Sequence, residues 1–184
     1  MINRIGSRAW NQPFTLSRRI SQWAKEHKLS FQRSDLCGYG LQEQVQLFAS
    51  ADIVVAVHGA ALTNIMFMRP KTVLIECFPP FYYEMTFETL ATLARVYYIP
   101  VFSFQIKGVR WNVKEIERMY QKGSFYAHRR KYIDHNVTPK DVQIIDALDR
   151  AYTYIWRSHT IFEKNDQWSG MDELADKCYR RINE

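Results

Sequence analysis

The segment ADIVVAVHGAALTNIMFM, residues 51–68, joins a run of β-branched and small apolar residues to a helix-type pattern through the turn His58–Ala61. The apolar run predicts a buried parallel strand over Ile53–Val57, and the pattern that follows predicts a helix over Leu62–Met68. The first N–H groups of a helix have no intrahelical partner and carry partial positive charge. A phosphate fits such a helix N-terminus, and open α/β sheets bind ligands at the carboxyl ends of their strands. The segment therefore indicates half of a nucleotide-dependent enzyme.

Short apolar strands and helical patterns alternate on both sides of this segment. Helices are expected over Leu16–Lys28, Leu41–Ser50 and Tyr83–Tyr97, and strands over Leu29–Arg33, Val73–Ile75 and Val101–Gln105. This alternation is typical of an α/β fold with a doubly wound parallel sheet. The sequence predicts a Rossmann-like domain over residues 1–105.

The character of the chain changes after about Lys107, where polar stretches separate further helical patterns. Helices are expected over Trp111–Gln121, Asp141–Trp156 and Met171–Arg181. We expect residues 106–184 to form a helical C-terminal extension packed on the α/β domain.

Composition limits the classes of function. The chain has 184 residues, 47% of them hydrophobic, so it is long enough for one domain with a substantial core. The net charge of +6 suits a phosphate-bearing partner, but the basic residues are scattered, and we predict no nucleic-acid partner. No apolar run approaches 18 residues, so we predict no membrane segment in this chain, and no signal-peptide pattern follows Met1.

The three cysteines, Cys37, Cys77 and Cys178, show no CxxC spacing and no histidine at zinc-ligand distance. We therefore predict no metal site. One disulfide and three free thiols both remain open.

Two residues at predicted strand ends carry chemistry. His58 and the amides of Gly59–Leu62 either hold a diphosphate, or His58 hydrogen-bonds a backbone carbonyl and closes the turn. Glu76 closes the next strand, where a carboxylate either accepts hydrogen bonds from a ribose diol or faces water.

Two further groups lie near these residues. Arg4 and Arg8 flank the turn Gly6-Ser7, and guanidinium groups match phosphate oxygens bidentately. Surface arginines without such a role are common. Thr63 and Asn64, in the first turn of the predicted helix, either donate to phosphate or cap the helix.

Five motifs occur along the chain in a fixed order. They are Arg-x-Gly-Ser-Arg (Arg4–Arg8), Glu43-Gln44-Val45, Ala51-Asp52, His-Gly-Ala-x-Leu-Thr-Asn (His58–Asn64) and Pro-x-x-Val-x-Ile-Glu (Pro70–Glu76). This order resembles the glycosyltransferase 61 family, which includes plant xylosyl- and arabinosyltransferases and animal O-linked N-acetylglucosaminyltransferases of the secretory pathway. The resemblance covers roughly residues 1–105.

The resemblance implies a GT-B transferase with two facing Rossmann-like domains and an inverting, metal-independent mechanism. This chain corresponds to the C-terminal, donor-binding half, so it implies a UDP-sugar donor, a protein or glycan acceptor, no cofactor and a missing N-terminal domain. It also implies the lumen of the Golgi or endoplasmic reticulum. The predicted nucleotide-sugar-binding residues are Arg4, Gly6, Ser7, Arg8, His58, Gly59, Ala60, Ala61, Leu62, Thr63, Asn64 and Glu76.

The chain departs from the family pattern at Ala61, where glycine is more usual, and at Ala9–Asn11, which replace a basic residue and a short apolar pair. An inverting transfer needs a general base, and the sequence pattern identifies none. A non-catalytic nucleotide-sugar-binding remnant or structural module is the alternative, and an unrelated nucleotide-binding module of convergent layout is a third.

Overall fold

The computed structural model describes residues 1–4, 9–80, 82–103 and 135–162. Its centre is a parallel sheet of three strands in the order β1 (Ile53–Val57), β2 (Val73–Phe78) and β3 (Tyr97–Phe102). Ile2 extends this sheet through single parallel bridges to Ala56 and to Ser34. The chain segments therefore lie in the order Ser34, Ile2, β1, β2, β3.

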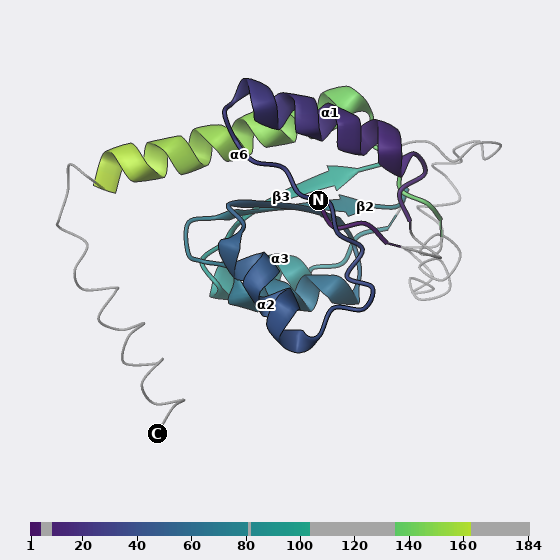
Figure 1. The fold of residues 1–184 in the computed structure, drawn as a ribbon, viewed down its shortest axis with the longest axis horizontal. Helices are drawn as coiled ribbons and strands as arrows, with labels where there is room; N and C mark the ends of the chain where they lie inside the picture. The colour runs from purple at the N-terminus through teal and green to yellow at the C-terminus, as the bar shows by residue number, and fades with distance from the viewer. Residues whose placement is uncertain (5–8, 81, 104–134, 163–184) are drawn as a thin grey trace, which may run out of the picture.

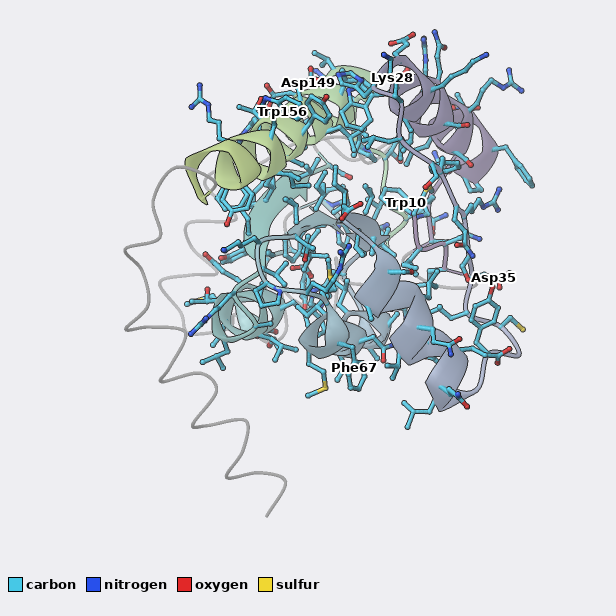
Figure 2. All side chains as sticks on the ribbon, turned by 60° about the vertical axis from the view of Figure 1, so that its left-hand side comes forward. Trp10, Lys28, Asp35, Phe67, Asp149 and Trp156 are labelled. Carbon is cyan, nitrogen blue, oxygen red and sulfur yellow. The ribbon has the colours of Figure 1, made fainter. Side chains whose placement is uncertain are left out.

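Helices cover both faces of the sheet (Figure 1). One face carries α1 (Pro13–Glu26) and α6 (Asp141–Phe162), and the other carries α2 (Leu41–Ser50), α3 (Thr86–Leu93) and the 3₁₀ helix η1 (Ala60–Phe67). Figure 2 shows Asp149 and Trp156 on the side of α1 and α6, and Phe67 on the opposite side. This arrangement confirms the predicted α/β class with a parallel sheet.

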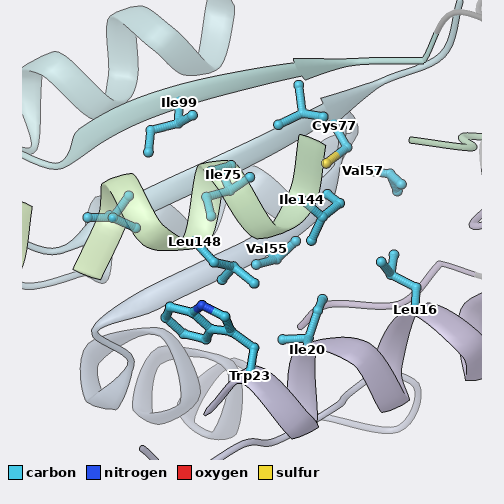
Figure 3. Close-up of a cluster of buried hydrophobic side chains, with 14 of the residues drawn as sticks. Leu16, Ile20, Trp23, Val55, Val57, Ile75, Cys77, Ile99, Ile144 and Leu148 are labelled. Carbon is cyan, nitrogen blue, oxygen red and sulfur yellow. The ribbon is translucent and has the colours of Figure 1, made fainter. Parts of the chain in front are cut away.

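The core beneath α1 and α6 joins parts of the chain that are far apart in sequence (Figure 3). Ile20 and Trp23 of α1 meet Leu148 of α6 above Val55 and Ile75 of the sheet. The indole Nε1 of Trp23 donates a hydrogen bond of 2.7 Å to Oδ1 of Asp149. Thus α6 completes the same core as α1.

The core on the other face is built by shorter elements. Phe48 of α2, Leu62 and Ile65 of η1 and Phe87 of α3 pack against the alternate side chains of the strands, among them Leu74. Successive strand residues point to opposite faces. Leu74 and Glu76 therefore face η1 and α3, whereas Ile75 and Cys77 face α1 and α6.

Several element bounds match the predictions. Helix α2 and strand β1 have the expected limits, and α6 begins at Asp141 as expected but continues to Phe162. The predicted helices Trp111–Gln121 and Met171–Arg181 lie outside the described residues.

Other predicted elements are wrong in type or extent. The helix predicted over Leu62–Met68 is a 3₁₀ helix that begins at Ala60. The strand predicted over Leu29–Arg33 is absent from the described structure, where this part of the chain contributes just the bridge at Ser34. Strand β2 does not end at Ile75 but runs through Glu76 to Phe78.

Two helices end earlier than predicted, because the residue that ends each of them is not the glycine that usually marks a helix C-terminus. The helix predicted to reach Tyr97 ends at Leu93, and β3 begins at Tyr97 in place of the expected Val101. Arg95 has φ 56°, and the amides of Arg95 and Val96 bond to the carbonyls of Thr92 and Ala91.

This is the Schellman helix ending, in which glycine is the usual left-handed residue. Helix α1 ends in the same way, with Lys28 at φ 59°, two residues before the predicted bound.

Among the described residues, no helix is long and apolar enough to cross a membrane.

Candidate functional site

A crevice is expected where the chain leaves two neighbouring strands toward opposite faces of the sheet. After Ile2 the chain passes to α1 on one face, and after the adjacent strand β1 it passes to η1 on the other. In open α/β sheets such a topological switch point is the place where ligands bind. Arg4 follows the bridge residue Ile2, and His58 follows β1, at this edge.

The backbone of the β1–η1 turn lies directly against a guanidinium group. Arg4 donates from Nη1 to the carbonyl oxygen of His58 over 3.5 Å. A Cβ atom placed on Gly59 would overlap Nη1 of Arg4. Gly59 has φ 164°, an extended conformation open to any residue, so a larger residue here would displace just the end of the Arg4 side chain.

The first turn of η1 leaves amide groups available at this turn. The amide of Leu62 bonds to the carbonyl of Gly59 over 2.9 Å, which is the first bond of the 3₁₀ helix. The amides of Ala60 and Ala61 precede this bond and have no partner within the helix. Ala60 and Thr63 are exposed, whereas the side chain of Leu62 is fully buried in the core.

The imidazole of His58 makes a buried pair with Glu76. Its Nδ1 lies 2.7 Å from Oε1 of Glu76, and the two side chains are 7% and 0% exposed. The other carboxylate oxygen, Oε2, accepts a hydrogen bond of 2.7 Å from the hydroxyl of Tyr98 on β3. Both oxygens of Glu76 therefore have protein partners, and strand β2 carries this carboxylate inside the sheet.

The second nitrogen of His58 points to an aromatic residue from the loop after β2. Nε2 lies 3.2 Å from the hydroxyl of Tyr82, which is also 3.4 Å from Oε2 of Glu84. Phe78 and Phe87 pack around the imidazole with ring centroids at 5.4 Å. Neither sequence interpretation of His58 described this network. The imidazole is hydrogen-bonded to the side chains of Glu76 and Tyr82 and not to a backbone carbonyl.

The motif Glu43-Gln44 supports the turn from a third element. Glu43 caps α2 by accepting a hydrogen bond of 2.7 Å from the amide of Gly40. Gln44 accepts a hydrogen bond of 2.9 Å from Nδ2 of Asn64 on η1. Two motifs separated in sequence are thus joined, and the side chain of Asn64 is held in place by α2.

The structure brings most of the predicted site residues to one edge. Arg4, His58–Asn64 and Glu76 lie there, whereas Gly6, Ser7 and Arg8 lie outside the described residues. Sequence reasoning missed Tyr98, which it placed between the helix expected to end at Tyr97 and the strand expected to begin at Val101. It also gave no link between Tyr82 and His58.

The thiols of Cys37 and Cys77 are free, the first exposed and the second buried. Burial, and then the charge of Glu76, raise the pKa of the Cys77 thiol well above its usual value. Cys37 and Cys77 therefore form no disulfide with each other. Cys178 lies outside the described residues.

Residues 2–75 match the model of the family Glycosyltransferase 61. This region of the chain is similar to the glycosyltransferase 61 family. No curated protein matches the chain. The glycosyltransferase 61 region contains Arg4 and the whole turn His58–Asn64, and it ends one residue before Glu76. The match supports a glycosyltransferase role, in which a sugar donor and an acceptor are the expected partners.

The buried network beside the glycosyltransferase 61 region predicts a loss of stability in alkali. Burial, the charge of Glu76 and the hydrogen bond to Glu76 together raise the pKa of Tyr98 well above its usual value. The unfolded chain releases this proton from about pH 10, while the folded chain retains it. The associated stability is therefore present below about pH 10 and falls by at most about 1.4 kcal/mol per pH unit above it.

Urea unfolding of the wild type and of Tyr98→Phe between about pH 9 and about pH 11 measures this term. The gap between their free energies of unfolding should narrow as the pH rises, because the variant lacks the phenol. Tyr97→Phe is the matched control, since the exposed Tyr97 precedes Tyr98 on the same strand, and its gap should stay constant. Parallel curves for the wild type and Tyr98→Phe would contradict the prediction.

Proposed function

We propose that this chain is the donor-binding half of a GT-B glycosyltransferase. It binds a UDP-sugar, whose sugar passes with inversion and without a metal to a hydroxyl of a protein or polysaccharide. The single observation that carries this proposal is the meeting of the Arg4 guanidinium with the glycine turn of β1 and η1 at the switch point of the sheet.

The charge that develops during transfer explains these groups. As the bond between the sugar and UDP breaks, negative charge grows on the β-phosphate. Preorganised positive groups at that position lower the barrier without reorganising. Arg4 supplies a full positive charge, and the amides of Ala60 and Ala61 supply hydrogen-bond donors at the start of η1.

The other predicted site residues divide into direct and supporting roles. Thr63 is exposed at the first turn of η1, and Asn64 is oriented by Gln44, so both suit contacts with the diphosphate. We assign Glu76 to positioning His58 in place of the predicted ribose contact, because both its oxygens are occupied and its side chain is fully buried.

The acceptor and the second half of the active site are part of the same proposal. We propose that an N-terminal GT-B domain faces this crevice and presents the acceptor, and that the enzyme works in the lumen of the Golgi or endoplasmic reticulum. Support for both comes from the glycosyltransferase 61 match over residues 2–75.

Calorimetric titration with UDP and with UDP-sugars tests donor binding. Arg4→Gln should weaken binding by about 10- to 100-fold, the usual effect of losing one hydrogen bond to a charged group. Gly59→Ala should weaken it in the same direction, because the new methyl group displaces the guanidinium of Arg4. Arg69→Gln is the matched control, since Arg69 pairs with Asp52 at the opposite edge of the sheet.

A wild-type protein that is folded by circular dichroism yet binds no UDP and no UDP-sugar would refute the proposal. Equal weakening by Arg4→Gln and Arg69→Gln would show that general positive charge, and not the switch-point crevice, holds the nucleotide. Tight binding of UDP with no sugar transfer, in protein that includes the proposed N-terminal domain, would favour the non-catalytic alternative.

A further inference from the structure

A chain of hydrogen-bonded side chains runs from inside the sheet to the loop after β2. Tyr98 donates to Glu76, Glu76 contacts Nδ1 of His58, and Nε2 of His58 contacts Tyr82, whose hydroxyl also reaches Glu84. The inner members are almost fully buried, with exposed fractions of 0% for Glu76, 6% for His58 and 2% for Tyr82. Glu84 is more exposed, so the chain has one end open toward the surface.

This row of hydrogen bonds can hold His58 in either its neutral or its charged form without movement of the heavy atoms. With a neutral His58, Nδ1–H donates to Glu76 and the hydroxyl of Tyr82 donates to Nε2. With a charged His58, Nε2–H donates to the oxygen of Tyr82, whose hydroxyl then donates to Glu84. The same distances serve both arrangements, and Glu76 balances the positive charge of the imidazolium, as a carboxylate does beside a catalytic histidine.

We propose that Glu84 is the general base of the transfer and that Tyr82 and His58, backed by Glu76, relay the proton inward from it. This inference rests on the proposed function. It supplies the proton acceptor that an inverting transfer requires and that sequence reasoning did not find. The relay is connected to the donor site through His58, whose carbonyl oxygen accepts the hydrogen bond from Arg4.

The proposed step is balanced. The acceptor oxygen forms a bond to the anomeric carbon, and the bond from that carbon to the β-phosphate oxygen breaks, so UDP leaves with the electron pair. The proton of the acceptor hydroxyl passes to the carboxylate of Glu84. In the same step Glu84 gives a proton to the oxygen of Tyr82, while Tyr82 gives its own to Nε2 of His58. Glu84 returns to its charged form, and the positive charge rests beside Glu76.

The position of Glu84 agrees with this role. The loop after β2 leaves the carboxyl edge of the sheet, the same edge at which β1 delivers His58 and Gly59. Glu88 provides an internal comparison, because this nearby carboxylate on α3 accepts a hydrogen bond from Tyr83 and has no contact with His58 in the described structure. The two carboxylates therefore differ in their connection to the site and not in their chemistry.

The test compares Glu84→Gln with Glu88→Gln in two measurements on the full-length enzyme, with the proposed N-terminal domain included. Calorimetry with UDP checks that each variant is folded and binds the nucleotide. Release of UDP from UDP-N-acetylglucosamine and UDP-xylose, with a xylan or a serine- and threonine-rich glycopeptide as acceptor, gives the transfer rate. Glu84→Gln should bind UDP within about twofold of the wild type and lose about 100- to 10,000-fold in rate, the usual effect of removing a general base. Glu88→Gln should change neither value by more than about twofold.

Tyr82→Phe separates a relay from a structural contact. In mixtures of H₂O and D₂O, the rate of a step that moves more than one proton depends on the deuterium fraction along a curve, and a one-proton step gives a straight line. The wild type should give the curve and Tyr82→Phe the line. A normal rate for Glu84→Gln, or a straight line for the wild type, would overturn the relay. UDP binding without any UDP release from the wild type would also overturn it and leave donor binding intact, whereas absence of UDP binding would refute the proposed function itself.

Discussion

Glu76→Ala is expected to lower the free energy of unfolding by about 2–6 kcal/mol, the usual cost of leaving two buried hydrogen-bond donors without an acceptor. The side chain has no exposed surface, and it accepts hydrogen bonds from Nδ1 of His58 and from the hydroxyl of Tyr98. Alanine leaves both donors without an acceptor in a place that water does not reach, and each such loss costs about 1–3 kcal/mol. For a domain whose total stability is about 5–15 kcal/mol, this is a large fraction.

Urea unfolding followed by circular dichroism measures the effect, with an unchanged m-value as the sign that both proteins unfold in the same way. Glu76→Gln should lose less, because the amide keeps one acceptor oxygen and the shape of the side chain. Glu26→Ala is the surface control and should change the free energy by about 0.5 kcal/mol or less, since Glu26 is exposed on α1. A loss below about 1 kcal/mol for Glu76→Ala would mean that water or a shifted side chain replaces the carboxylate.

Leu148→Ala is expected to lower the free energy of unfolding by about 2–5 kcal/mol, the range for truncating a buried leucine. Leu148 is 1% exposed on α6 and packs with Trp23 and Val55 in the core beneath α1 and α6 (Figure 3). Truncation removes the transfer free energy of the lost atoms and leaves a cavity between α6 and the sheet. The loss should be that of a core residue, because α6 shares its packed face with α1.

Val142→Ala on the same helix is the matched control. Val142 is 69% exposed, so this substitution should change the free energy of unfolding by about 0.5 kcal/mol or less. Thermal unfolding of both variants, read at one concentration and one heating rate, provides the comparison. Equal small changes for Leu148→Ala and Val142→Ala would mean that α6 does not stabilise the sheet.

Features of the fold that depend on neighbouring residues were predictable. The run Ile53–Val57 is bounded by Asp52 on one side and by His58-Gly59 on the other, so both ends of β1 followed from local chemistry. Helix α2 was equally well bounded, between Gly40 and the turn at Ala51-Asp52. Its N-terminus is closed by the hydrogen bond from Gly40 to Glu43, a local signal of the capping type.

Features of the fold that depend on partners distant in the sequence were not predictable. Strand β2 was predicted to stop before Glu76 because a carboxylate rarely lies inside a sheet, and the partners that satisfy it come from other elements, His58 after β1 and Tyr98 on β3. The ends of α1 and α3 were misplaced because Lys28 and Arg95 occupy the left-handed position that glycine usually marks. Long-range contacts and non-glycine helix endings leave no periodic signal in the chain.

The candidate site shows the same division. The turn His58–Asn64 is one continuous segment, so its residues were recognised together. The link from Gln44 to Asn64 and the chain from Tyr98 to Glu84 join four different parts of the sequence, and only the folded arrangement brings them into contact.

The pairing of α1 with α6 also governs the order in which this protein takes shape during synthesis. The hydrogen bond between Arg19 and Asp141 closes a separation of 122 residues, and that between Trp23 and Asp149 closes 126. Such distant contacts form slowly, because the entropy cost of closing a long loop comes before the contacts that offset it. As the ribosome delivers the chain, α1 emerges before α6, and its apolar side must wait for α6 to be translated. In that interval the apolar residues on this face of the sheet are exposed, and exposed apolar surface is prone to aggregation.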